Sequence, residues 1–140
     1  MIKVLFGEKG TGKTKLLIDT ANKISAESVG DVVFIDDSNQ LMYDINHKIR
    51  FINVMEYPVK GQACFLSFIS GIIAEDYDID TIIIDRLTHI TKQKPEELKE
   101  FLEGIKTLGE NKNINFIITV TGNASSIPEF FREYEVEMLK

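Results

Sequence analysis

The sequence has a single cysteine, Cys64, among its 140 residues. This excludes an internal disulfide and a metal centre built on several cysteines, and it favours a reducing compartment. Cys64 stands in an apolar run, so we expect it to be a small residue of the hydrophobic core. Histidine is also scarce. His47 and His89 have no metal-like spacing with other ligands, and we assign neither of them a role.

Long hydrophobic runs are missing too. The longest apolar stretch, residues 63–74, contains two serines and a glycine, and it is shorter than the about 20 residues that a bilayer requires. The first residues lead directly into a strand-like segment, without the features of a targeting sequence. We therefore expect a cytoplasmic protein that does not contact membranes.

Positive charge is in deficit. Lysine and arginine number 16 against 22 aspartates and glutamates, which leaves a net charge of −6. Broad, sequence-independent binding of nucleic acid needs a basic surface, so we do not expect a nucleic-acid partner. The hydrophobic fraction of 44% is that of an ordinary globular protein, and the length fits one domain over residues 1–140.

The most informative segment is residues 7–14, Gly-Glu-Lys-Gly-Thr-Gly-Lys-Thr. It matches the phosphate-binding pattern G-x-x-x-x-G-K-[ST], in which backbone N–H groups surround a polyphosphate. An apolar run suited to a buried strand precedes it at residues 2–6, and residues 15–24 carry apolar side chains at helical spacing. Strand, glycine loop and helix follow in the required order, and the start of a helix favours phosphate. The alternative is a glycine-rich turn with an accidental lysine.

The pattern assigns roles to individual residues. Lys13 would neutralise the β- and γ-phosphates, and the Thr14 hydroxyl would ligate Mg²⁺. Asp85 ends an apolar strand, as expected of the acid that holds the magnesium, although such an acid can also simply mark the end of a strand. The predicted nucleotide-binding residues are Gly7, Glu8, Lys9, Gly10, Thr11, Gly12, Lys13, Thr14, Lys15 and Thr121.

Strand-like and helix-like segments alternate along the chain. We predict strands at residues 2–6, 32–35, 49–54, 79–85 and 114–120, helices at 15–24, 61–76 and 95–109, and a short helix through residue 44 that is capped at residues 38–40. Alternating polarity in residues 134–139 favours a last edge strand after one helical turn, and mixed polarity places 49–54 at a sheet edge. Most strands are continuously apolar. The pattern predicts a three-layer α/β/α sandwich with a mostly parallel sheet of five to six strands.

Parallel sheets bind ligands at the carboxyl ends of their strands. Hydrolysis at this rim also needs a group that orients the attacking water. The glutamate that often follows the strand-ending aspartate is replaced here by Arg86. The remaining acids near the γ-phosphate are Asp36 and Asp37 at the end of the second strand, which we predict to be catalytic together with Lys13. The alternative is that the two acids only terminate a strand and cap a helix.

Residues 34–41, Phe-Ile-Asp-Asp-Ser-Asn-Gln-Leu, resemble the segment that carries the catalytic acid pair in RecA/KaiC-like ATPases. Residues 84–88, Ile-Asp-Arg-Leu-Thr, resemble their Ile-Asp-Ser-Leu-Thr. The resemblance implies a P-loop NTPase with ATP as its nucleotide and the strand order 3-2-4-5-1-6. It also implies that Asp36 and Asp37 lie beside Asp85, and that Thr121 or Asn123 takes the sensor position after the fifth strand.

The chain differs from that family at the acid pair that would control hydrolysis. Aspartate replaces glutamate in the acid pair, which shortens each side chain, and a misplacement of about 1 Å can cost on the order of a hundredfold in rate. We therefore expect binding of ATP with Mg²⁺ and slow hydrolysis. One alternative is a non-catalytic, nucleotide-responsive interaction module. Another is a small nucleoside or nucleotide kinase, although no arginine-rich lid is visible.

Families of this fold assemble with ATP between subunits, so the resemblance allows a homo-oligomer or a protein partner across the nucleotide site. In such assemblies a neighbour supplies an arginine or lysine. We interpret Arg50, Arg86 and Arg132 instead as surface charges or members of local salt bridges. The loops that bind DNA in the family correspond to residues 86–94 and 122–128, which contain few basic residues and give DNA binding little support.

Overall fold

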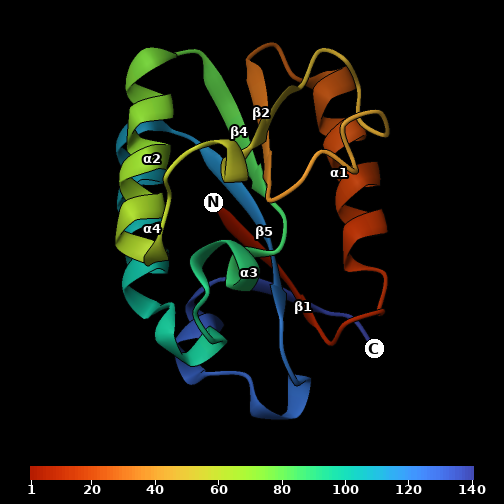
Figure 1. Cartoon of the computed structure of the whole chain (residues 1–140), viewed down its shortest axis with the longest axis vertical. Coiled ribbons are helices and arrows are strands. Elements are labelled where there is room, and N and C mark those ends of the chain that lie inside the picture. The colour runs from red at the N-terminus through yellow and green to blue at the C-terminus, as the bar shows by residue number, and fades with distance from the viewer.

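The computed structural model describes all 140 residues and has an α/β architecture (Figure 1). The strands are β1 (Ile2–Gly7), β2 (Asp31–Asp36), β3 (Arg50–Asn53), β4 (Ile79–Ile84), β5 (Asn115–Thr121) and β6 (Glu135–Met138). The helices are α1 (Lys13–Glu27), α2 (Gly61–Glu75), α3 (Leu87–Thr91) and α4 (Lys99–Lys112). Short 3₁₀ turns are η1 (Val54–Glu56), η2 (Pro95–Glu97), η3 (Ala124–Ser126) and η4 (Glu129–Glu133).

The six strands form one sheet in the order β3-β2-β4-β5-β1-β6, and every pairing is parallel. The predicted strand order is confirmed, as are the edge positions of the third and last strands. The register places Gly7 opposite Thr121 and Asp36 opposite Asn53. The carboxyl ends of the strands therefore share one rim of the sheet.

Helices cover both faces of the sheet, with α1 on one side and α2 and α4 on the other (Figure 1). Alternation along β1 shows why. Val4 and Phe6 belong to the larger core cluster beneath α2 and α4, whereas Leu5 packs with Leu17 and Ala21 of α1. Because successive strand residues point to opposite faces, continuously apolar strands bury both surfaces of this sheet.

The short helix expected at residues 38–44 is wrong. The segment consists of successive turns, in which the Met42 N–H donates to the Asn39 carbonyl at 3.2 Å and the Asp44 N–H donates to the Leu41 carbonyl at 2.9 Å. These bonds span three residues rather than the four of an α-helix. The segment ends by placing Ile45 in the core beside α1. Packing of Ile45 against the sheet therefore determines the path of this segment, and a local helix does not form.

Two expectations about single residues are also wrong. Gly109 does not end α4, which continues to Lys112 and stops at Asn113 with a left-handed φ of 56°. Gly109 instead lies so close to the following strand that a Cβ would be 2.8 Å from the carbonyl oxygen of Ile114. Cys64 is exposed rather than buried, because α2 turns only one stripe, including Phe65, into the core.

Candidate functional site

The loop between β1 and α1 contains two glycines with left-handed backbone. Gly10 (φ 83°) and Gly12 (φ 87°) adopt left-handed conformations, which other residues rarely tolerate. Gly12 is the N-cap of α1. The first N–H groups of a helix have no partner within the helix, and together with the helix dipole they favour a negative ligand. Both positions with left-handed backbone are therefore glycines of the sequence pattern, and the loop leads into the N-terminus of α1.

Lys13 lies folded over this loop. Its Nζ donates to the Glu8 carbonyl oxygen at 2.7 Å, and only 8% of the residue is exposed. Burial lowers the pKa of Lys13, and the nearby Asp85 carboxylate only partly offsets this effect. A cation that is poorly solvated gains free energy when an anion binds beside it. The buried Lys13 ammonium therefore lies at the loop for which the sequence predicts a phosphate ligand.

Asp85 follows β4 and joins two elements of the site. The Thr14 hydroxyl donates to its Oδ2 at 3.1 Å, and the Thr119 hydroxyl donates to its Oδ1 in a short hydrogen bond. Thr119 in turn accepts the backbone N–H of Arg86 at 2.8 Å. These contacts hold the buried Asp85 carboxylate against the first turn of α1, with a hydroxyl and a carboxylate as adjacent oxygen ligands.

The acid pair lies at the end of β2 and is bound to Arg86. Arg86 Nε donates to Asp36 Oδ1 at 3.4 Å, and its Nη2 forms an ion pair with Asp37 Oδ1 and donates to Ser38 Oγ at 3.3 Å. Burial opposes the charge of Arg86, but the carboxylates of Asp36, Asp37 and Asp85 outweigh it and raise the pKa of Arg86. The guanidinium therefore stays charged and holds the pair together.

Asp36 is the unusual member of the pair. It is fully buried, and its Oδ2 has no hydrogen-bond partner, while the Asp37 N–H donates to its Oδ1 at 2.7 Å. Burial raises the pKa of Asp36 to about 7, helped by the Asp85 charge and opposed by the Asp37 N–H and by Arg86. A carboxyl group that titrates near neutral pH is suited to accept a proton.

A polar cavity of about 300 Å³ brings the predicted residues together. None of the residues that line it is hydrophobic; they are Lys9, Gly10, Gly12, Lys13, Thr14, Asp85, Arg86, His89, Thr119 and Thr121. Asp36 and Asp37 are not part of this lining. Arg86 contacts the acid pair through its side chain and is also among the residues that line the cavity, so this residue connects the predicted catalytic acids with the predicted phosphate site.

A larger hollow of about 610 Å³ lies on the other side of the loop. Glu8 and Thr11 contribute to it from the loop, and Asn123 and Leu139 from the segments after β5 and β6. The Asn123 side chain is already used, because it accepts the N–H of Ser125 at 2.9 Å. Of the two residues expected at the sensor position, Thr121 therefore lines the polar cavity and Asn123 does not.

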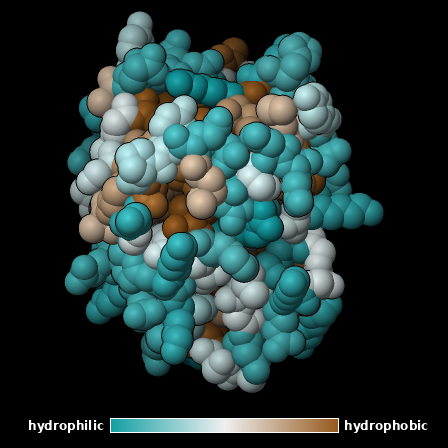
Figure 2. Space-filling view, in the orientation of Figure 1, coloured by the Kyte–Doolittle hydropathy of each residue, from teal (hydrophilic) through white to brown (hydrophobic).

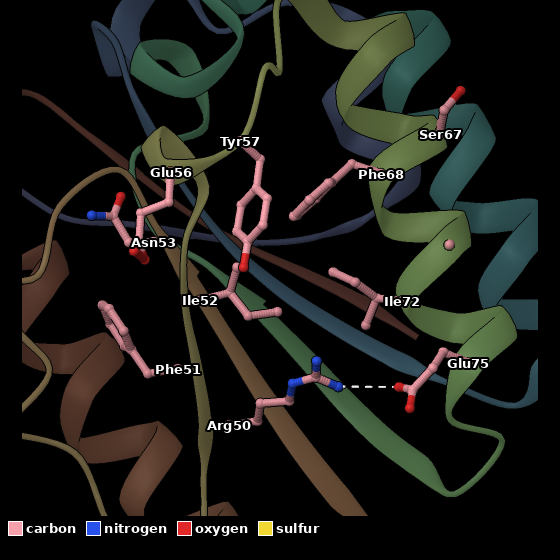
Figure 3. A pocket seen from close by; sticks show the side chains of 11 residues that line it. Arg50, Phe51, Ile52, Asn53, Glu56, Tyr57, Ser67, Phe68, Ile72 and Glu75 are labelled. Carbon is pink, nitrogen blue, oxygen red and sulfur yellow. Dashed lines mark hydrogen bonds and ion pairs between the residues drawn. The ribbon is translucent and has the colours of Figure 1, made fainter.

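A third hollow, of about 440 Å³, lies between β3 and α2, and none of its residues belongs to the loop. In Figure 3 the Tyr57 and Phe68 rings point toward one another, and their centroids are 5.4 Å apart. The Arg50 guanidinium and the Glu75 carboxylate pair at 3.2 Å at its other end. Figure 2 shows hydrophobic surface on this side of the molecule, near α2, on a face that is otherwise largely hydrophilic.

The lining of the two hollows beside the loop differs in part from the predicted set of site residues. Lys15 is exposed on α1 and lines neither hollow beside the loop. His89, which received no role, lines the polar cavity, and so does Thr119. A lone hydroxyl inside the apolar run of β5 was the available signal for Thr119. Arg50 and Arg86 form local salt bridges, as expected.

Comparison of the sequence with models of known protein families and with curated proteins finds no match. None of the helices has the length and apolar character needed to cross a membrane. No group of three or more histidine, cysteine, aspartate or glutamate side chains is arranged to hold a metal ion.

Proposed function

We propose that this chain binds ATP with Mg²⁺ at the loop of residues 7–14 and hydrolyses it slowly, as a minimal RecA/KaiC-like ATPase core. One observation carries the proposal. The glycine loop, Asp85 after β4 and Thr121 at the end of β5 line a single cavity without hydrophobic residues. A polyphosphate is the ligand that fits a buried lysine, a helix N-terminus and a polar wall.

The oxygen ligands at this site fit magnesium. Thr14 Oγ1 and Asp85 Oδ2 lie 3.1 Å apart, and Mg²⁺ prefers one or two protein oxygens together with phosphate and water. When bound, the ion would neutralise charge on the β- and γ-phosphates. Lys13 would add a second positive charge beside the same phosphates, and Thr119 would keep the Asp85 carboxylate oriented.

The acid pair supports slow hydrolysis. In the reaction a water oxygen bonds to the γ-phosphorus, the bond to the ADP oxygen breaks, and a proton of the water passes to a carboxylate. Asp36 and Asp37 are the acids that we predict to accept this proton. Arg86, however, binds both of them, and neither lines the cavity. A base that must first be released gives a low rate.

Calorimetry with the purified chain tests nucleotide binding directly. We expect magnesium-dependent binding of ATP, with GTP as the comparison, because no residue yet defines the base. Lys13→Ala should lose about tenfold or more in affinity, as expected for a charge-assisted contact. Lys23→Ala, an exposed lysine on the same helix, is the matched control. Absence of binding to either nucleotide would refute the proposal.

The second candidate is a nucleotide-responsive interaction module that does not hydrolyse ATP. The pairing of Arg86 with Asp36 and Asp37 favours it, because this pairing keeps the acids out of the cavity. A partner or a second copy of the chain at the rim would then respond to bound nucleotide. Incubation with ATP and Mg²⁺ distinguishes the two: release of ADP supports the ATPase, and intact ATP bound at one per chain supports the module.

A further inference from the structure

Arg86 has an unusual backbone for its position. It follows Asp85 directly and adopts a left-handed φ of 58°, a conformation that costs free energy in residues other than glycine, asparagine and aspartate. Its N–H donates to Thr119 Oγ1, and its carbonyl accepts the N–H groups of His89 and Ile90 at the start of α3. The backbone is therefore held on both sides, and the side chain leaves it in one defined direction.

The side chain of Arg86 belongs to two sites at once. It is bound to Asp36, Asp37 and Ser38 through Nε and Nη2, while Nη1 has no hydrogen-bond partner within the protein. Arg86 is also among the residues that line the polar cavity, together with Lys13 and Thr14, and 35% of its side chain is exposed. A guanidinium at such a boundary can exchange one anionic partner for another without leaving the site.

Carboxylates and phosphates suit a guanidinium equally well, because both accept two parallel hydrogen bonds from its planar fork. The loop and Lys13 hold the β- and γ-phosphates of a nucleotide, and Asp85 stands at the same cavity. Arg86 is the only arginine among the residues that line this cavity, so its guanidinium is the one available to a phosphate bound there. ADP, which lacks the γ-phosphate, offers Arg86 no new partner.

We propose that Arg86 is a switch within the chain, which pairs with Asp36 and Asp37 in the absence of nucleotide and with the γ-phosphate when ATP is bound. The exchange frees the two acids to contact the attacking water. This inference rests on the proposed nucleotide binding and adds to it a residue that distinguishes ATP from ADP. It requires no arginine from a neighbouring subunit.

Calorimetric titration with Mg²⁺·ATP and with Mg²⁺·ADP tests this switch. Asparagine tolerates left-handed backbone, so Arg86→Asn removes the guanidinium and leaves the φ of this position acceptable. We expect the affinity for ATP to fall about tenfold, as for loss of a charged hydrogen bond, while the affinity for ADP changes less than about twofold. Arg86→Lys, which keeps the charge without the fork, should recover part of the loss. Arg132→Asn, an exposed arginine on η4, is the control and should bind both nucleotides as the parent does.

Equal losses for ATP and ADP would overturn the switch, because they indicate a structural role, and so would unchanged affinity for both. In either case the parent still binds nucleotide, and the proposed function stands. A parent that binds neither nucleotide refutes both proposals. If Arg86→Asn does not fold, because Asp36 and Asp37 lose their cation, the comparison is made between Asp37→Asn and the double variant Asp37→Asn, Arg86→Asn. The double variant must then bind ATP more weakly than Asp37→Asn does, with little change in its affinity for ADP.

Discussion

Thr119 donates a hydrogen bond to the carboxylate of Asp85, a residue 34 positions earlier in the chain. The contact joins β5 to the residue after β4 and lies within the buried interior, where Thr119 is 1% exposed. The same hydroxyl oxygen accepts the Arg86 N–H. One side chain therefore orients the predicted magnesium ligand and supports the left-handed backbone beside it.

Thr119→Val tests this relationship. Valine has the same shape but neither donates nor accepts a hydrogen bond, so a buried carboxylate oxygen and a buried N–H both lose a partner. We expect the free energy of unfolding to fall by about 1–3 kcal/mol, measured by urea denaturation. Thr107→Val is the control, because Thr107 is exposed on α4. An unchanged midpoint for Thr119→Val would show that the contact does not stabilise the fold.

Gly12→Ala should damage the loop without any steric clash. An added Cβ at Gly12 meets no atom within 4 Å, but its φ is 87°, so the cost is backbone strain of about 1–2 kcal/mol. We expect lower stability and weaker nucleotide binding. Gly71→Ala is the matched comparison: its Cβ also meets nothing, but it lies within α2, and alanine there should stabilise by about 0.5–1 kcal/mol. Equal effects at the two glycines would contradict the role assigned to Gly12.

Stability should fall as pH rises through the titration of Asp36. The pKa of Asp36 is raised to about 7 by burial in the folded chain, whereas an unfolded aspartate titrates near 4. The folded state thus binds more protons between these values, and its advantage is lost as pH rises toward 7. Urea denaturation of the parent at pH 5 and pH 8 should show this loss. In Asp36→Asn it should be smaller by about 3 kcal/mol, and the same loss in both proteins would exclude Asp36 as its source.

The acid pair should control the rate of hydrolysis. Asp36→Asn and Asp37→Asn each remove a carboxylate that can accept the proton of the attacking water, and general-base catalysis contributes roughly a hundredfold or more. We expect single-turnover ATP cleavage to slow accordingly. Asp19→Asn, an exposed acid on α1, is the control. Rates that match the parent in both variants would remove the pair from the mechanism.

Local pattern was sufficient for much of the architecture. Apolar runs identified β1, β2, β4 and β5, because a strand buried on both faces has no polar positions to interrupt it. The glycines of residues 7–14 and the lysine after them predicted the loop, since its left-handed backbone and its charge depend on residues that are adjacent in sequence. The strand order was predicted by resemblance to a family and is confirmed by the pairings.

Expectations failed where distant packing decides the outcome. Residues 38–44 carry helix-capping residues, yet they form turns, because the chain must bring Ile45 onto the sheet beside α1. Cys64 is apolar in context but exposed, since α2 presents only one stripe to the core. Gly109 is typical of a helix end in the sequence, but in the structure its lack of a side chain allows the helix to lie close to the Ile114 backbone.

The sequence alone determined the glycine turn between β1 and α1, the alternation of strands and helices, and the acids at the carboxyl ends of β2 and β4. Only the tertiary structure decided how those acids are used. It pairs the Arg86 guanidinium with Asp36 and Asp37, although Asp36 lies 50 residues earlier in the chain. It also brings the Thr119 hydroxyl into hydrogen-bond contact with Asp85. The physical reason is that charges and hydroxyls act over a few ångströms in space, and the parallel pairing of β2, β4 and β5 determines which of them come that close.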